Sequence, residues 1–472
     1  PGPAGADSYT PGPAGTDSYT PGPAGTDRQA PEAGKADRDA RQYLFKPAGF
    51  GHLYILKILL NLIQINIGMA DTFDRFFSDA THLMKKSAIR EILKLTQRPE
   101  MISFAGGLPS PDSFPIEDIR RVASEVLEQD GKSALQYGTT EGDNKLRALL
   151  AERHRKDGLE IGPENILITT GSQQALDLCG KIFVNRGDVV LCGLPSYLGG
   201  LNAFANYGAL LKGIPLDDHG MHPELLEKTI TDLKKEGKII KFIYMIPDFQ
   251  NPTGVTMPAS RRLEIIRIAE RHDLLIVEDS PYRDVRFAGT PEPLMSSLDT
   301  HGRVMTLNTF SKILAPGFRL AWVTGHREII DKMVTAKQST DLCTPPFVQK
   351  IVARYIEQGL LDANLKKTIA LYHRRRDFML KCFRELMPEG VKWTEPDGGL
   401  FLFVTLPPAM DAAHLLDKAI CKNVAFVCGS VFYCNNEGHN TMRLNFSYAD
   451  EEDTLEGIRR LAEVIREEMA TP

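Results

Sequence analysis

Seven short apolar runs, separated by amphipathic stretches, constrain the fold of this chain more than any other feature. A run such as 274–278 is apolar at nearly every position, which is typical of a strand buried on both faces. This alternation predicts an α/β fold: a mostly parallel seven-stranded sheet sandwiched by helices, with functional side chains at the strand ends. The seven runs are residues 166–170, 189–194, 209–214, 241–246, 274–278, 304–307 and 320–324.

A lysine lies just beyond the run 304–307. Lys312 ends the tetrapeptide 309–312, Thr-Phe-Ser-Lys, and a second cation follows at Arg319. A sheltered lysine beside another cation can be neutral, and therefore nucleophilic, while an anion is bound nearby. The sequence predicts that Lys312 forms a Schiff base. A solvated surface lysine is the commoner meaning of so short a motif, so the prediction depends on three further groups upstream.

The first of these groups is suited to bind a phosphate. Residues 165–172 run from an apolar strand into a glycine turn, and Ser172 and Gln173 begin a stretch of helical character. Unpaired N–H groups at a helix N-terminus and the helix dipole stabilise a phosphate dianion. Ser172 would equally suit an ordinary helix cap. Arg319 favours the phosphate, because its forked guanidinium can hold two phosphate oxygens.

The other two groups are suited to the ring of pyridoxal phosphate. Asp279 ends a buried apolar run, where its carboxylate can keep the pyridine nitrogen protonated. Glu278 precedes it on the opposite face of the strand and is predicted to be structural. Tyr282 and Asn251 can both donate to the ring oxygen. Asn251 also begins the sequence Asn-Pro-Thr-Gly, which by itself predicts only a turn.

From Phe73 to its C-terminus the chain resembles the pyridoxal-phosphate-dependent aminotransferases of fold type I, class I/II. Within that family it is most similar to the kynurenine/2-aminoadipate aminotransferases and the bacterial multi-substrate aminotransferases. Each shared motif is short, but together they are specific. The motifs are 102–109 (ISFAGGLP), 135–138 (LQYG), 170–174 (TGSQQ), 251–254 (NPTG), 278–282 (EDSPY), 310–312 (FSK) and 442–447 (MRLNFS).

The resemblance implies pyridoxal 5′-phosphate as the cofactor and assigns its contacts. Lys312 carries the Schiff base and Asp279 pairs with the ring nitrogen. Asn251 and Tyr282 contact the ring oxygen. Tyr197 stacks on the ring, although a tyrosine in such a place often merely packs. The implied phosphate contacts are Ser172, Gln173, Ser311, Arg319 and, from the second subunit of a homodimer, Tyr137. Thr309 completes the set where the family often has serine, and threonine keeps the hydroxyl.

The resemblance also implies a substrate site. Arg443 binds the α-carboxylate, which a guanidinium matches bidentately. The backbone of Gly107 closes over the substrate, Asn251 contacts it, and Arg90 approaches its side chain. Judged from the residues alone, Arg443 could be a rim arginine paired with an acid, and Arg90 a solvated charge on a helix.

The implied activity is that of an aminotransferase. An amino group would move from an L-amino acid to a 2-oxo acid, expected to be 2-oxoglutarate, by a ping-pong mechanism. The donor could be 2-aminoadipate or an aromatic, branched or aliphatic amino acid. A β-lyase or decarboxylase is the alternative, because the cofactor carries the chemistry of all these reactions. A ligand-sensing transcriptional regulator is a remote alternative, since residues 1–68 are too rich in proline for a DNA-reading motif.

The composition agrees with a cytoplasmic enzyme. A formal net charge of -5 argues against a nucleic-acid partner. The 7 cysteines are odd in number and contain no CxxC pair, which predicts reduced thiols and no zinc or other metal site.

The N-terminus has a different composition from the rest. Residues 1–27 repeat a Pro/Gly-rich decapeptide that cannot form a core, so 1–68 is predicted to be a disordered low-complexity extension with a loose apolar helix. The apolar segment 53–67 is interrupted by polar residues and is too short to span a membrane. The resemblance divides the remainder into 69–117 and 345–472, which form a small α+β domain, and 118–344, the large cofactor-binding domain.

Overall fold

The computed structural model describes residues 73–84, 86–95 and 98–470. The extension and the apolar helix predicted within residues 1–68 lie outside the described residues. Among those that are described, no helix is both long enough and apolar enough to cross a membrane.

The larger sheet has eight strands in the order β2-β9-β8-β7-β6-β3-β4-β5. All seven predicted runs are strands of this sheet. Of these seven, β9 alone runs in the direction opposite to the other six, so the prediction of a mostly parallel sheet is confirmed. The eighth strand is a two-residue partner of β4, too short to have a periodicity of its own. The strands are β2 (Ile166–Thr169), β3 (Val189–Leu194), β4 (Leu210–Asp217), β5 (Gly220–Met221), β6 (Ile240–Met245), β7 (Leu275–Asp279), β8 (Val304–Thr309) and β9 (Ala321–Thr324).

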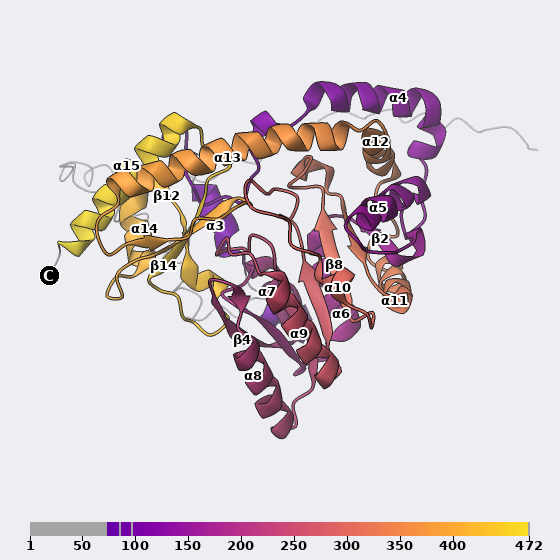
Figure 1. Cartoon of the computed structure of the whole chain (residues 1–472), viewed down its shortest axis with the longest axis horizontal. Helices are drawn as coiled ribbons and strands as arrows, with labels where there is room; N and C mark the ends of the chain where they lie inside the picture. Colours follow the sequence, from indigo (N-terminus) through magenta and orange to yellow (C-terminus); the bar gives the residue numbers. More distant parts are fainter. Residues whose placement is uncertain (1–72, 85, 96–97, 471–472) are drawn as a thin grey trace, which may run out of the picture. The chain divides into compact units, whose positions relative to one another are not determined.

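Helices cover both faces of this sheet because its strands are apolar on both. Along β6, Phe242 and Tyr244 lie in one buried cluster with residues of α6 (Ser172–Phe183) and α7 (Leu198–Ala205). The intervening Ile243 lies in the opposite cluster, with residues of α8 (Pro223–Lys235) and α9 (Ala259–His272). Figure 1 shows α8 and α9 side by side. The period-two alternation of a strand therefore divides its side chains between two helical layers.

A second, four-stranded antiparallel sheet has the order β10-β11-β14-β13. Its strands are β10 (Lys392–Trp393), β11 (Phe401–Thr405), β13 (Val427–Cys428) and β14 (Thr441–Asn445). A separate parallel pair joins β1 (Ile102–Ser103) to β12 (Val424–Ala425), which brings residues 102–103 beside the C-terminal part of the chain.

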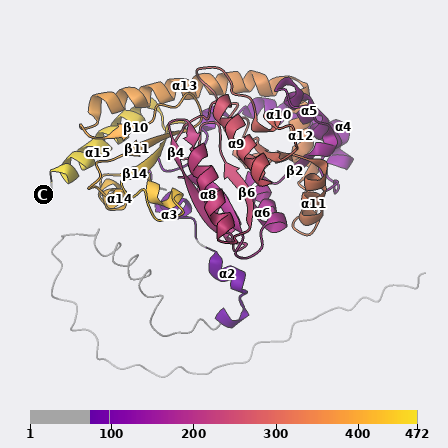
Figure 2. The same ribbon diagram turned by 60° about the horizontal axis from the view of Figure 1, so that its bottom comes forward.

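The long helix α13 (Leu360–Leu386) contacts α12 (Pro346–Glu357) and, over its C-terminal half, α15 (Glu451–Met469). Figure 2 shows α13 running along one edge of the described fold. The remaining α-helices are α2 (Asp79–Leu83), α3 (Ala88–Leu95), α4 (Ile116–Ala134), α5 (Asn144–Lys156), α10 (Met295–Leu298), α11 (Arg327–Gln338) and α14 (Ala412–Cys421).

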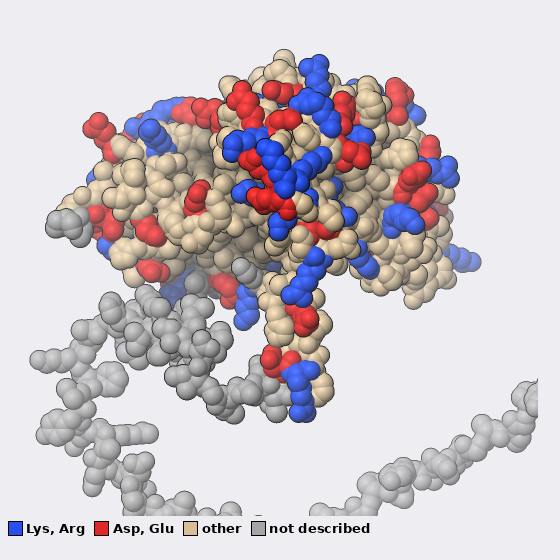
Figure 3. Space-filling view, turned by 90° about the horizontal axis from the view of Figure 1, so that it is seen from below, with Lys and Arg blue, Asp and Glu red and all other residues tan. Residues whose placement is uncertain are grey.

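Charged side chains of both signs are interspersed on the surface. Figure 3 shows Lys and Arg among Asp and Glu on one face. Exposed pairs such as Lys228–Asp232 on α8 contribute only about 0–1 kcal/mol each. Arg262 on α9 is different, because its guanidinium is fully buried and donates to both carboxylate oxygens of Asp248 at 2.8 and 3.1 Å. It also lies 4.0 Å from Glu278, whose carboxylate accepts from the backbone of Met295 on the face opposite Asp279.

Replacing Arg262 tests whether the buried network of Arg262, Asp248 and Glu278 stabilises the folded protein. We expect Arg262→Met to lower the free energy of unfolding by about 3–5 kcal/mol, because the substitution removes the cation nearest to two buried carboxylates and leaves Asp248 only the longer contact with Arg286 at 3.7 Å. The matched control is Arg261→Met, which breaks the more exposed pair with Asp217 and should cost about 0–1 kcal/mol. Urea denaturation of both variants makes the comparison, and equal losses would contradict the role given to Arg262.

Candidate active site

The carboxyl ends of two neighbouring strands place the first two predicted residues. Asp279 is the last residue of β7, in register with Leu307 of β8, and is 3% exposed. Its Oδ2 accepts a hydrogen bond of 2.8 Å from the phenol of Tyr244, whereas its buried Oδ1 has no partner in the described part of the chain. Lys312 lies in the turn just beyond β8, and its Nζ donates to the Gly107 carbonyl at 2.8 Å. Asp279 thus presents one buried, unpaired acceptor.

Arg443 on β14 brings the second sheet to the same site. The guanidinium is 1% exposed; one Nη donates to Asn251 Oδ1 and the other to the Ala105 carbonyl, both at 2.9 Å. Asn251 in turn donates to the Tyr282 hydroxyl at 3.4 Å. The Nε of Arg443 is buried and has no partner among the described residues. A buried cation with a free donor is suited to receive an anion, so the rim position considered from the sequence is wrong.

Two aromatic rings hold Arg443 in place. Its guanidinium carbon lies 4.1 Å from the ring centroid of Phe401 and 5.0 Å from that of Phe432. Phe401 also packs edge-on against Tyr282, with centroids 5.8 Å apart. Burial lowers the pKa of Arg443 to about 10, and it remains charged at neutral pH.

The start of α6 forms the opposite end of the site. Gly171 has a φ of 81°, and a Cβ there would come within 2.4 Å of the Arg319 guanidinium, so this guanidinium lies directly against the helix N-terminus. Ser172 begins the helix, and its Oγ lies 3.4 Å from the Asn308 carbonyl. Gln173 donates to the Gly199 carbonyl. Helix N–H groups, a hydroxyl and a guanidinium gathered here are suited to an anion.

The hydroxyl residues before Lys312 interact with one another. Thr309 Oγ1 donates to Ser311 Oγ at 3.0 Å and accepts from the Ser311 backbone N–H at 3.1 Å. These bonds fix the turn that leads from β8 to Lys312. The threonine hydroxyl therefore serves a local structural purpose at this position.

Burial and neighbouring charge shift the pKa values of the central groups. Burial lowers the pKa of Lys312 to about 8, helped by the positive charges of Arg443 and Arg319. Burial raises the pKa of Asp279 to about 7, against the hydrogen bond from Tyr244. Burial and the charge of Asp279 raise the pKa of Tyr197, which the charges of Arg443, Arg90 and Arg319 lower. These mutual effects place the groups around one site.

The arrangement fits pyridoxal 5′-phosphate. Asp279 Oδ1 is an unpaired acceptor for a protonated ring nitrogen, and Lys312 is an amine able to condense with an aldehyde. The N-terminus of α6 with Arg319 can hold the phosphate. Donors, acceptor and amine are the set that this cofactor requires.

Two of the predicted site residues are exposed in the single chain. Tyr137 is 79% exposed, and Arg90 is exposed on α3.

The sequence analysis missed Tyr244, Phe401 and Phe432. Tyr244 had a usable signal, because it sits near the carboxyl end of the strand beside β7. The two phenylalanines had none, since their positions over Arg443 depend on tertiary packing.

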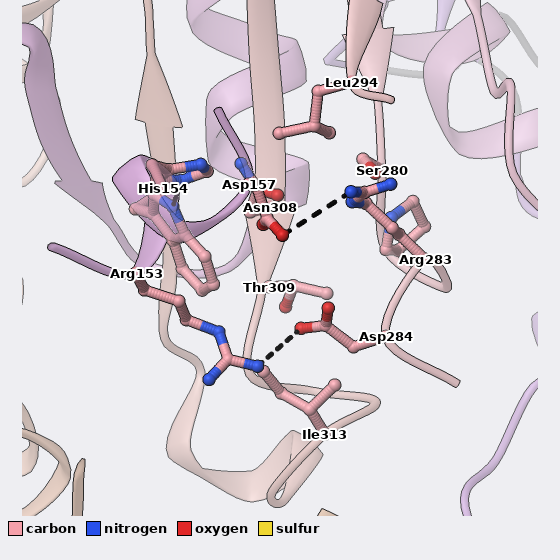
Figure 4. Close-up of a pocket in the computed structure, with 12 residues that line it drawn as sticks. Arg153, His154, Asp157, Ser280, Arg283, Asp284, Leu294, Asn308, Thr309 and Ile313 are labelled. Carbon is pink, nitrogen blue, oxygen red and sulfur yellow. Dashed lines mark hydrogen bonds and ion pairs between the residues drawn. The ribbon is translucent and has the colours of Figure 1, made fainter. Parts of the chain in front are cut away.

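A small pocket beside the active site is lined by Asn308 and Thr309 of β8 together with residues of other elements (Figure 4). The pairs Arg153–Asp284 and Arg283–Asp157 lie in it. Burial lowers the pKa of His154 to about 4, and its Nε2 accepts from Trp322 at 2.8 Å, so the ring is neutral. The free volume is only about 20 Å³, roughly the room of one water molecule, which excludes an amino acid.

Comparison with known proteins gives a consistent result. The family model for aminotransferase class I and II matches residues 99–461. Aromatic-amino-acid aminotransferase 1 of Thermococcus litoralis is 49% identical over 84% of this chain and 95% of its own. The 2-aminoadipate transaminase of Thermus thermophilus is 39% identical over 83% of this chain and 96% of its own. A crystal structure of Pyrococcus horikoshii kynurenine aminotransferase in complex with PMP superimposes with a TM-score of 0.82, at 47% identity, covering 86% of this chain and 100% of its own.

The lowered pKa of Lys312 predicts unusual reactivity in the cofactor-free protein. We expect acylation of Lys312 by acetic anhydride to rise with a midpoint near pH 8, because its amine is neutral above that pH. A lysine in an unstructured reference peptide should give a midpoint at about pH 10.4. Arg443→Gln removes a positive charge and should move the Lys312 midpoint upward. Mass spectrometry of the labelled peptides gives both midpoints, and a wild-type midpoint like that of the reference contradicts the prediction.

Proposed function

The chain belongs to the class I and II aminotransferases, and we propose that it transfers the amino group of an aromatic amino acid or of 2-aminoadipate to 2-oxoglutarate. Transamination between amino acids and 2-oxo acids, with pyridoxal 5′-phosphate, follows from the family. The choice of donor and acceptor is the proposal. Its donors are those in the names of the relatives from Thermococcus litoralis and Thermus thermophilus.

One observation carries the assignment of roles: a buried carboxylate, a lysine amine and a buried guanidinium face one site from three different parts of the chain. Asp279 Oδ1 is the partner of the ring nitrogen, and Lys312 is the residue that binds the cofactor covalently. Ser172, Gln173, Thr309, Ser311 and Arg319 hold the phosphate end. Tyr197 packs on the ring, and Asn251 and Tyr282 contact its oxygen.

When bound, the cofactor supplies an electron-withdrawing ring that stabilises negative charge on the substrate α-carbon. Lys312 Nζ takes the proton from that carbon, and a base positioned in this way contributes about 10²–10⁴-fold to the rate. Its lowered pKa suits the task, because a large fraction of the amine is neutral near pH 8. Asp279, ionised at the same pH, balances the positive charge of the ring nitrogen.

Arg443 orients the amino acid. Its unpaired Nε and the remaining Nη hydrogens can receive the α-carboxylate, while Asn251 and the Ala105 carbonyl keep the guanidinium in position. The Gly107 backbone lies beside Lys312 and covers the substrate. Arg90 on the exposed helix α3 is the residue proposed to approach the substrate side chain.

We also propose a homodimer in which Tyr137 reaches the phosphate of the partner's cofactor. The support is its 79% exposure, together with that of Leu135 at 73%, since large apolar side chains exposed together mark an interface.

The pairing of β1 with β12 supports the proposed small domain of 69–117 and 345–472 beside the large domain of 118–344. Seven free cysteines support a cytoplasmic location.

A panel of amino acids tests the proposed reaction. We expect aromatic amino acids and 2-aminoadipate to give glutamate from 2-oxoglutarate, and to change the visible absorbance of the bound cofactor. Glutamate production is measured with a coupled dehydrogenase. Pyruvate and ammonia in its place indicate a β-lyase, and release of carbon dioxide indicates a decarboxylase. If no amino acid changes the absorbance, transamination is wrong for this chain.

Hybrid dimers test the roles of Lys312 and Tyr137 together. Lys312→Ala should abolish turnover while cofactor still binds reversibly, and Tyr137→Ala should lose activity through weaker phosphate binding. In a two-fold symmetric dimer, mixing the two inactive variants should restore about a quarter of wild-type activity, because each hybrid has one intact site. Activity after unfolding and refolding the mixture is the measurement. No recovery would place Tyr137 outside the partner's site.

A further inference from the structure

Asp279 is held by a residue that no sequence motif indicated. We propose that Tyr244 is a positioning residue, whose phenol fixes the Asp279 carboxylate so that Oδ1 faces the ring nitrogen of the cofactor. The inference rests on the proposed role of Asp279 and deepens it. Tyr244 acts only through the carboxylate.

The contact is short and completely buried. Tyr244 on β6 is 0% exposed, and its hydroxyl donates to Asp279 Oδ2 at 2.8 Å. The two side chains come from adjacent parallel strands, with Tyr244 in register with Val277. With Oδ2 engaged, Oδ1 is the oxygen left without a partner among the described residues. One hydrogen bond therefore decides which oxygen faces the cofactor.

The phenol itself has little freedom to move. Phe204 of α7 packs against the Tyr244 ring at an interplanar angle of 73°, with centroids 5.2 Å apart. On the same helix, a Cβ at Gly200 would lie 2.7 Å from the Tyr244 hydroxyl oxygen. The absence of a side chain at Gly200 makes room for the phenol. A glycine and an aromatic ring together fix the direction of the hydrogen bond.

The surroundings of Asp279 make this donor necessary. The titratable groups whose pKa values respond to Asp279 are Tyr244 on β6, Cys179 on α6, Tyr197 before α7 and Tyr282 after β7. Burial and the charge of Asp279 raise the pKa of the Cys179 thiol, which stays protonated and is only a weak donor. Burial raises the pKa of Asp279 to about 7, and the Tyr244 hydrogen bond opposes that rise. Without the phenol the carboxylate would be protonated at a higher pH, and a neutral acid balances a ring cation poorly.

Tyr244→Phe removes the donor and keeps the ring, and the Asp279 carboxyl reports the result. In the cofactor-free protein, infrared titration, with Asp279→Asn to identify the band, should give a wild-type midpoint near pH 7. We expect Tyr244→Phe to raise that midpoint by about one to two units, and to weaken cofactor binding about tenfold or more. The aromatic ring of residue 244 stays in place, so KM for the amino donor should change little. The loss of the hydrogen bond to Asp279 should lower kcat.

Two further variants separate positioning from general destabilisation. Tyr207 also donates to a carboxylate, Asp177 Oδ2 at 3.2 Å, and Tyr207→Phe makes the same chemical change on a different aspartate. It should leave the Asp279 midpoint and cofactor binding unchanged. Gly200→Ala displaces the phenol without removing it and should shift the midpoint in the same direction as Tyr244→Phe.

The inference and the proposed function fail in different ways. If the wild-type enzyme is active and Tyr244→Phe titrates and binds cofactor like the wild type, the role given to Tyr244 is wrong. Equal shifts in Tyr207→Phe and Tyr244→Phe would also overturn it. If wild-type protein binds no cofactor and moves no amino group, the proposed function itself fails.

Discussion

A carboxylate buried at the carboxyl end of β7 is the constraint on which the rest of the site depends. Charge in a low-dielectric interior is costly unless hydrogen bonds or an opposite charge compensate it. Asp279 has one such hydrogen bond, from Tyr244, and one oxygen with nothing to balance it in the described chain. A bound group that brings a positively charged nitrogen to this oxygen compensates the buried negative charge. The carboxylate therefore both selects the cofactor and depends on it.

The positive groups of the site, in contrast, destabilise one another's charge. Arg443 and Arg319 both lower the pKa of Lys312, after burial has done so to a larger extent. In the roles proposed for them, the same two arginines bind anions at opposite ends of the site, Arg443 the carboxylate of an amino acid and Arg319 a phosphate. When those anions bind, they offset the positive charge near the lysine. The readiness of Lys312 to accept a proton is thus coupled to whether the site is filled.

The sequence predicted the sheet well because its strands are buried on both faces. Strands such as β2, β3 and β7 are buried along nearly their whole length, and that burial leaves a nearly continuous apolar run in the sequence. β4 is the exception, because most of its residues are at least partly exposed. The two-residue strands β1, β5, β10, β12 and β13 left none, since a period needs more residues than they have. Lys312, Asp279 and Asn251 stood out through short motifs at or beyond strand ends, and Arg443 through a motif within a strand. The rings around Arg443 could not be assigned, because their roles come from residues distant in the sequence that meet only in the fold. Tyr244 had a positional signal near the end of its strand, but its partner Asp279 is identified only by the fold.

The short helix α3 carries Arg90, the proposed substrate contact that lies exposed on a helix. Arg90 lies exposed on eight residues of helix, whereas Asp279 and Arg443 are strand residues enclosed by packed cores. With the role proposed for Arg90, changes on α3 alter which donor side chain is accepted and leave the chemistry shared by all amino acids intact. Diversification of substrate preference within such a scaffold needs no redesign of its interior. New specificities can be acquired one surface substitution at a time.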